Sequence, residues 1–84
     1  MTVTLRLFAS AREAAGRGTD EYDLHTTPSV GAVLDAAGRA YGPTFEAVLA
    51  TARVWVNGDE PADGRATQLA DGDEVAVLPP VSGG

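Results

Sequence analysis

The sequence predicts an α+β fold in which one main amphipathic helix covers one face of a mixed sheet of four or five strands. Three observations predict it. The first residues alternate between apolar and polar side chains, a central stretch has apolar residues at helical spacing, and short strand-like stretches follow that helix. A chain of 84 residues can form one domain with one hydrophobic core.

The first two predicted strands form a β-hairpin with a long connection. Residues 2–8 alternate, and their inner face carries three aliphatic side chains: Val3, Leu5 and Leu7. Residues 10–13 (SARE) fit a capping box that opens one short helical turn, which Gly16 and Gly18 end. Residues 20–25 then form a weaker strand, with Tyr22 and Leu24 on its inner face.

The main helix begins after Ser29, which is a good N-cap residue. Its apolar residues follow helical spacing and form one stripe: Val30, Val33, Leu34, Ala37 and Tyr41. Gly42-Pro43 ends this helix. Three further apolar residues then predict a short second helix: Phe45, Val48 and Leu49.

The third predicted strand covers residues 53–57, with Val54 and Val56 facing inward and Trp55 facing outward. Asn57-Gly58 is a strong signal for a tight turn. We expect a brief edge strand near Glu60-Pro61 after this turn. These features predict a second region of short strands after the helix.

The last predicted strand covers residues 74–78, after the turn at Asp71-Gly72. Leu69 fills the core before the turn, and Val75 and Val77 face inward. The order of elements matches the β-grasp fold, in which the first and last strands lie side by side and parallel at the sheet centre. By this analogy residues 1–78 form the domain and residues 79–84 form a flexible tail.

The chain ends in Gly83-Gly84, which follows the segment Leu78-Pro79-Pro80-Val81-Ser82. Glycine has no Cβ, so this end is the thinnest peptide that a partner's tunnel can accept. A carboxylate on such a tip can reach an active site in another protein. The structural alternative is a frayed end without function.

Three large apolar residues lie on the outer face of their predicted strands: Phe8, Trp55 and Leu78. If the first and last strands are parallel neighbours, Phe8 and Leu78 meet at the end of the sheet where the tail begins. Single exposed apolar residues are normal on protein surfaces. Three together beside a reactive tail predict a docking surface for a partner protein.

The composition excludes several classes of function. The net charge of −6 argues against nucleic acid and anionic membranes as partners. The chain has no Cys, and His25 is its only His, so we expect no metal site. Every base is Arg, so the chain has no lysine side chain that could accept an isopeptide bond. Without a signal peptide or a long apolar run, we expect a cytoplasmic protein.

Three segments resemble one known family. They are residues 5–13 (LRLFASARE), the pair Val56-Asn57, and residues 69–84 (LADGDEVAVLPPVSGG). The chain resembles MoaD, the sulfur carrier or small subunit of molybdopterin synthase, in the MoaD/ThiS ubiquitin-like superfamily. The resemblance therefore implies a ubiquitin-like β-grasp fold. One position departs from the family, because the position of Leu78 is often aromatic.

The resemblance implies that Gly84, preceded by Gly83, is the reacting end of the chain. An E1-like adenylating enzyme (MoeB-like) adenylates the Gly84 carboxylate with ATP, and a sulfur donor displaces AMP to leave a thiocarboxylate. A larger, MoaE-like subunit receives the tail and supplies most catalytic groups, and the sulfur passes to cyclic pyranopterin monophosphate. The chain is then not catalytic alone and binds no cofactor permanently. The expected partner-binding residues are Phe8, Trp55, Leu78, Pro79, Pro80, Val81 and Ser82.

Two alternatives remain open. The same chemistry at Gly84 could serve a carrier for thiamine, cysteine or tRNA thiolation. An alternative of another class is a β-grasp binding module in which the Gly-Gly end is incidental. A longer C-terminus would leave such a module active but would inactivate a carrier.

Overall fold

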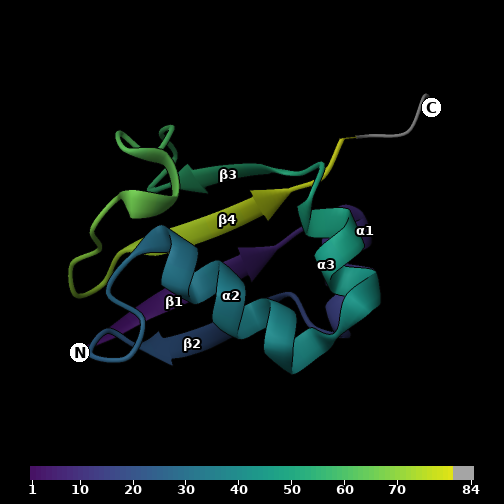
Figure 1. The fold of residues 1–84 in the computed structure, drawn as a ribbon, viewed down its shortest axis with the longest axis horizontal. Helices are drawn as coiled ribbons and strands as arrows, with labels where there is room; N and C mark the ends of the chain where they lie inside the picture. Colours follow the sequence, from purple (N-terminus) through teal and green to yellow (C-terminus); the bar gives the residue numbers. More distant parts are fainter. Residues whose placement is uncertain (81–84) are drawn as a thin grey trace.

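The computed structural model describes residues 1–80, and its elements form a sheet with helices packed against it (Figure 1). Residues 81–84 of the predicted tail lie outside the described residues. The elements follow in the order β1 (Thr2–Leu7), α1 (Ala9–Ala15), β2 (Thr19–Asp23), α2 (Val30–Tyr41), α3 (Pro43–Leu49), β3 (Arg53–Val56), a 3₁₀ turn η1 (Gly64–Ala66) and β4 (Glu74–Leu78).

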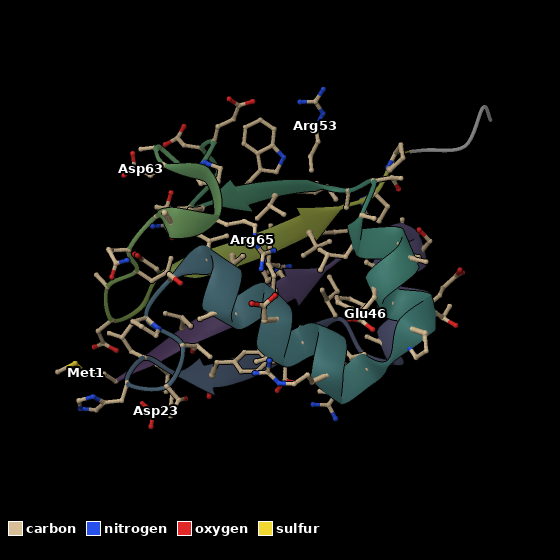
Figure 2. The ribbon with its side chains drawn as sticks, in the orientation of Figure 1. Met1, Asp23, Glu46, Arg53, Asp63 and Arg65 are labelled. Carbon is tan, nitrogen blue, oxygen red and sulfur yellow. The ribbon has the colours of Figure 1, made fainter. Side chains whose placement is uncertain are left out.

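The four strands have the spatial order β2-β1-β4-β3. β1 pairs antiparallel with β2 and parallel with β4, and β4 pairs antiparallel with β3. The predicted β-grasp arrangement, with the first and last strands parallel at the centre, is confirmed. Figure 2 shows the consequence, because Met1 and Asp23 lie at the end of the sheet opposite to the one that the tail leaves.

The core lies between the sheet and the helices α2 and α3, which lie on one face of the sheet (Figure 1). The strand residues predicted to face inward in β1 and β4 are all buried, and so is the stripe of α2 from Val30 to Ala37. Phe45 from α3 is the largest fully buried side chain and meets the Tyr41 ring edge to face at 5.1 Å. The short second helix is therefore part of the core.

The start and end of α2 match their predicted signals. The Ser29 hydroxyl accepts a hydrogen bond from the backbone N–H of Ala32 at 3.2 Å. Gly42 has a φ of 92°, a conformation that favours glycine, and Pro43 then takes the first position of α3.

Two local predictions are wrong. Helix α1 begins at Ala9 and not after Ser10, because the chain turns directly after β1 and the Phe8 carbonyl accepts the first N–H groups of the helix. Ser10 therefore lies inside the first turn and caps nothing. No edge strand forms near Glu60-Pro61 either, since Pro61 has no N–H and the chain enters η1 instead. The described sheet has four strands.

Asn57 links the turn after β3 to the start of β4. It has a φ of 51°, followed by 84° at Gly58, as a two-residue hairpin turn requires. Its side-chain N–H donates to Asp73 Oδ1 at 2.9 Å, and its Oδ1 accepts the Glu74 N–H at 2.9 Å. The Val56-Asn57 and Asp73-Glu74 segments, far apart in the sequence, are therefore hydrogen-bonded to each other.

Two tyrosines connect α2 to β2. The Tyr41 hydroxyl donates to Asp20 Oδ2 at 2.5 Å, and the Tyr22 hydroxyl is buried nearby without a hydrogen-bond partner among the described residues. Burial raises the pKa of both phenols, and the hydrogen bond to Asp20 raises the pKa of Tyr41 further. Both side chains are therefore held in the neutral form in the folded protein.

We expect Asn57→Ala to lower the free energy of unfolding by about 2 kcal/mol, because it removes two hydrogen bonds and places an ordinary residue at positive φ. Asn57→Gly is the matched control, since glycine tolerates this φ. It should still lose about 1 kcal/mol in urea unfolding. An Asn57→Gly variant as stable as the wild type would show that the hydrogen bonds contribute nothing.

We expect the protein to lose stability above about pH 10, the pKa of an unfolded tyrosine. Because both phenol pKa values are raised on folding, their contribution is complete below that pH and declines as the pH rises through the folded values. The chain has no Lys or Cys to titrate in this range. Urea unfolding between about pH 8 and pH 11 measures how steeply the free energy of unfolding falls with pH. Tyr41→Phe should make this fall shallower. Equal slopes would contradict this assignment.

Candidate functional site

The face of the sheet away from α2 and α3 carries a shallow apolar hollow of about 310 Å³. The structure brings the three predicted outward residues together there, although they come from three separate parts of the chain. The hollow is lined by Phe8, Trp55, Gly58, Glu74, Ala76 and Leu78. One of its lining residues, Leu78, is the last residue of β4 and directly precedes Pro79.

The strand register explains why these side chains meet. Leu78 and Ala76 alternate with the buried valines of β4 and therefore point away from the core. Trp55 is the cross-strand partner of Ala76. Phe8 directly follows β1, and its N–H donates to the Val77 carbonyl at 3.2 Å, which holds Phe8 beside the end of β4. Parallel pairing of β1 and β4 thus places Phe8 and Leu78 at the same end of the sheet.

The hollow is apolar, with charged side chains on its rim. Phe8 is 38% exposed, while Trp55 and Leu78 are half-buried. The Arg6 guanidinium lies 5.5 Å from the centre of the Phe8 ring, and its Nη1 is 3.8 Å from a Glu74 carboxylate oxygen. Partially exposed aromatic side chains around an apolar hollow are typical of a protein-binding surface.

The tail starts at the end of the sheet where Phe8 and Leu78 lie. Pro79 is buried and Pro80 is exposed, so the chain leaves the core between these two residues. Of the predicted partner-binding residues, Pro79 is therefore placed to direct the tail, and Pro80 is accessible. The other predicted tail residues, Val81, Ser82, Gly83 and Gly84, lie outside the described residues.

Sequence reasoning did not select three of the lining residues: Gly58, Glu74 and Ala76. The alternation of β4 places Glu74 and Ala76 on the outer face, but only large apolar residues on that face were predicted to bind a partner. Ala76 matters because it is small between large neighbours, and those neighbours become known only from the strand register.

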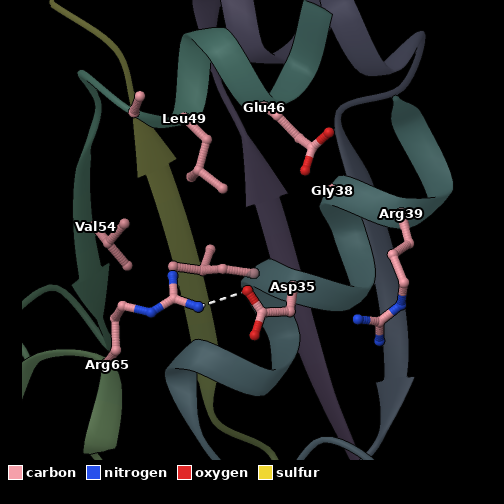
Figure 3. Close-up of a pocket in the computed structure, with 9 residues that line it drawn as sticks. Asp35, Gly38, Arg39, Glu46, Leu49, Val54 and Arg65 are labelled. Carbon is pink, nitrogen blue, oxygen red and sulfur yellow. Dashed lines mark hydrogen bonds and ion pairs between the residues drawn. The ribbon is translucent and has the colours of Figure 1, made fainter. Parts of the chain in front are cut away.

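A larger hollow of about 500 Å³ lies on the helix side, between α2, α3, β3 and η1 (Figure 3). Arg65 reaches across it to α2, where its Nη2 is 2.5 Å from Asp35 Oδ1 and donates to the Gly31 carbonyl at 3.3 Å. These contacts hold η1 against α2. They also pair the charges of Arg65 and Asp35, two of the residues that line the groove, with each other. The groove lies on the opposite face of the sheet from the apolar hollow.

Among residues 1–80, no group of three or more His, Cys, Asp or Glu side chains could hold a metal ion. None of the helices in the same part of the chain is long and apolar enough to cross a membrane. The one histidine, His25, is exposed and follows β2.

The chain is similar over its full length to known proteins. Small archaeal modifier protein 3 of Haloferax volcanii is 38% identical over 92 residues, and the molybdopterin synthase sulfur carrier subunit of Chlamydomonas reinhardtii is 33% identical over 90 residues. Both alignments cover 100% of each chain. The crystal structure of SAMP1 from Haloferax volcanii has a TM-score of 0.84 and 34% identity, again over 100% of both chains.

These similarities cover the whole fold and extend to the C-terminal glycines. The ThiS family matches residues 5–84, from the first strand to the last residue of the chain. The four-stranded mixed sheet with its helices is the ubiquitin-like β-grasp fold. The chain therefore belongs to the ThiS family of ubiquitin-like sulfur carriers.

Proposed function

We propose that this protein carries sulfur on its own C-terminus for the synthesis of molybdopterin. The observation that carries the proposal is that two residues of the apolar hollow, Phe8 and Leu78, lie at the end of the sheet where the tail starts. A partner that covers Phe8 and Leu78 is thereby placed to receive Gly84. The 33% sequence identity to a molybdopterin synthase sulfur carrier subunit, over the whole chain, supports molybdopterin synthesis as the pathway that receives the sulfur.

The chemistry starts at the Gly84 carboxylate, which is a poor electrophile. An E1-like adenylating enzyme joins it to AMP from ATP and releases pyrophosphate. The mixed anhydride is reactive, so a sulfur donor can displace AMP and leave a thiocarboxylate. ATP is thus a substrate of the activating enzyme, and this chain needs no cofactor of its own.

The chain contributes the C-terminal carboxylate that carries the sulfur, and its partners contribute the catalytic groups. The segment from Pro80 to Gly84 has five residues, which would span roughly 17 Å if fully extended. The reacting atoms of each partner should therefore lie within that distance of Pro79. Any side chain at position 84 would enter the narrowest part of the partner's active site.

Transfer to the final acceptor needs a second partner. We propose a larger, MoaE-like subunit of molybdopterin synthase, which binds the tail and passes the sulfur to cyclic pyranopterin monophosphate. The Chlamydomonas relative is named as a subunit, which agrees with assembly into a complex. A carrier for thiamine, cysteine or tRNA thiolation would use the same first two steps with another acceptor.

A second candidate function has its own support. The Haloferax volcanii relative is named a modifier protein, at 38% identity over the whole chain. In this role an amine of another protein would attack the Gly84 acyl-adenylate, forming an amide bond and releasing AMP. Because the chain has no lysine, it would add as a single unit and would not build lysine-linked chains.

Intact mass spectrometry tests the carrier function. The full chain is incubated with an activating enzyme, ATP and a sulfur donor. We expect a mass gain equal to the replacement of one oxygen by one sulfur, localised to Gly84. With an activating enzyme that is active on another carrier, the absence of both this gain and an AMP adduct would contradict the proposal.

We expect Gly84→Ala to reduce adenylation by about tenfold or more, because its methyl group crowds the reacting carboxylate. The melting temperature should not change, since position 84 lies beyond the last strand. Pyrophosphate release by the activating enzyme measures the effect. Normal adenylation and sulfur transfer by this variant would contradict the narrow-tunnel argument.

We expect Phe8→Asp to weaken partner binding by at least about tenfold while lowering stability little, because Phe8 is partly exposed and outside the core. Ala47→Asp, which adds the same charge on the exposed side of α3, is the matched control. Calorimetric titration with the activating enzyme and thermal unfolding measure the two effects. A large fall in melting temperature for Phe8→Asp would show that Phe8 belongs to the core.

A further inference from the structure

The hollow on the sheet face exists because one of its central residues is small. Ala76 lies between Arg6 of β1 and Trp55 of β3 across the sheet. Along β4 its neighbours on the same face are Glu74 and Leu78. A larger side chain at position 76 would fill the space, so the hollow is a socket with Ala76 as its floor.

The socket is apolar apart from one charged lining residue, Glu74. Within residues 1–80 no hydrogen bond is made to the Glu74 carboxylate, and its nearest cation is Arg6 at 3.8 Å. Both side chains of this pair are nearly half exposed, at 47% and 44%, so solvent screens the pair and it stabilises the fold little. The carboxylate can therefore exchange Arg6 for a cation of a partner.

The aromatic wall of the socket is also available. Arg6 already lies over the Phe8 ring, whereas Trp55 takes part in no cation–π or aromatic pair among the described residues. A tryptophan face is the strongest cation–π acceptor among the side chains. Trp55 and Glu74 both line the socket, and they favour the same kind of group, a planar cation.

We propose that the socket receives an arginine side chain of the activating enzyme. Its methylene groups would lie on Ala76 and Leu78, its guanidinium plane against Trp55, and its N–H groups would donate to Glu74. The net charge of −6 on this chain fits a basic surface around that arginine. This inference rests on the proposed function, because it assumes that the sheet face docks the enzyme that adenylates Gly84.

Two variants test the socket by steady-state kinetics of adenylation, with the purified activating enzyme as the probe. Ala76→Leu fills the socket, and we expect the KM for the carrier to rise by about tenfold or more while kcat changes less than about twofold. Ala47→Leu adds the same groups on α3 and should leave KM unchanged. Glu74→Gln should raise KM at low salt and make KM less dependent on salt than in the wild type.

Thermal unfolding of each variant shows whether it is folded, and Glu74→Gln keeps the size of the side chain if Ala76→Leu fails to fold. An unchanged KM for folded Ala76→Leu would overturn the socket. A raised KM for Ala76→Leu with no effect of Glu74→Gln would also overturn the proposal, because the occupant would then be apolar. If Phe8→Asp still weakens binding in these cases, the docking face stands and only this inference fails. Wild-type protein that is never adenylated would contradict the proposed function itself.

Discussion

The parallel pairing of β1 with β4 at the centre of the sheet is the constraint on which the rest of the structure depends. Parallel neighbours need a long crossover connection, and here the connection contains the helices and both outer strands. The inner faces of the pair are Val3, Leu5 and Leu7 opposite Val75 and Val77, all of which are buried. The same pairing fixes which end of the sheet the tail leaves.

This topology separates stability from function. The helix side of the sheet contains the core, whereas the apolar hollow lies on the other face, and its residues Phe8 and Leu78 lie at the end where the tail begins. Large outward residues such as Phe8 and Trp55 can therefore serve recognition without being needed for the core. In the proposed function the reacting group is the C-terminal carboxylate, and the sheet face serves recognition.

Much of the fold could be predicted because local and tertiary signals agree. The alternation in β1 and β4, the apolar stripe of α2, and the Asn57-Gly58 turn all match the structure. The predictions that were wrong depended on context. Ser10 looks like an N-cap, but the chain turns into α1 directly after β1, at Phe8.

The candidate site was predicted only in part, for a related reason. Large outward residues are visible in a single strand, so Phe8, Trp55 and Leu78 could be selected from the sequence. A hollow depends on a small residue between large cross-strand neighbours, and no local pattern identifies Ala76 as its floor. The Asn57–Asp73 hydrogen bond likewise joins residues that only the folded sheet brings together.

In the proposed function one partner covers the sheet-face hollow while it receives the tail. Backbone NMR of the isotope-labelled chain, titrated with the activating enzyme and ATP, shows which face the partner covers. We expect chemical shifts to change around Phe8, Trp55, Ala76 and Leu78, and residues of α2 to stay unaffected. Changes confined to the helix-side groove around Leu34, Leu49 and Arg65 would contradict this expectation.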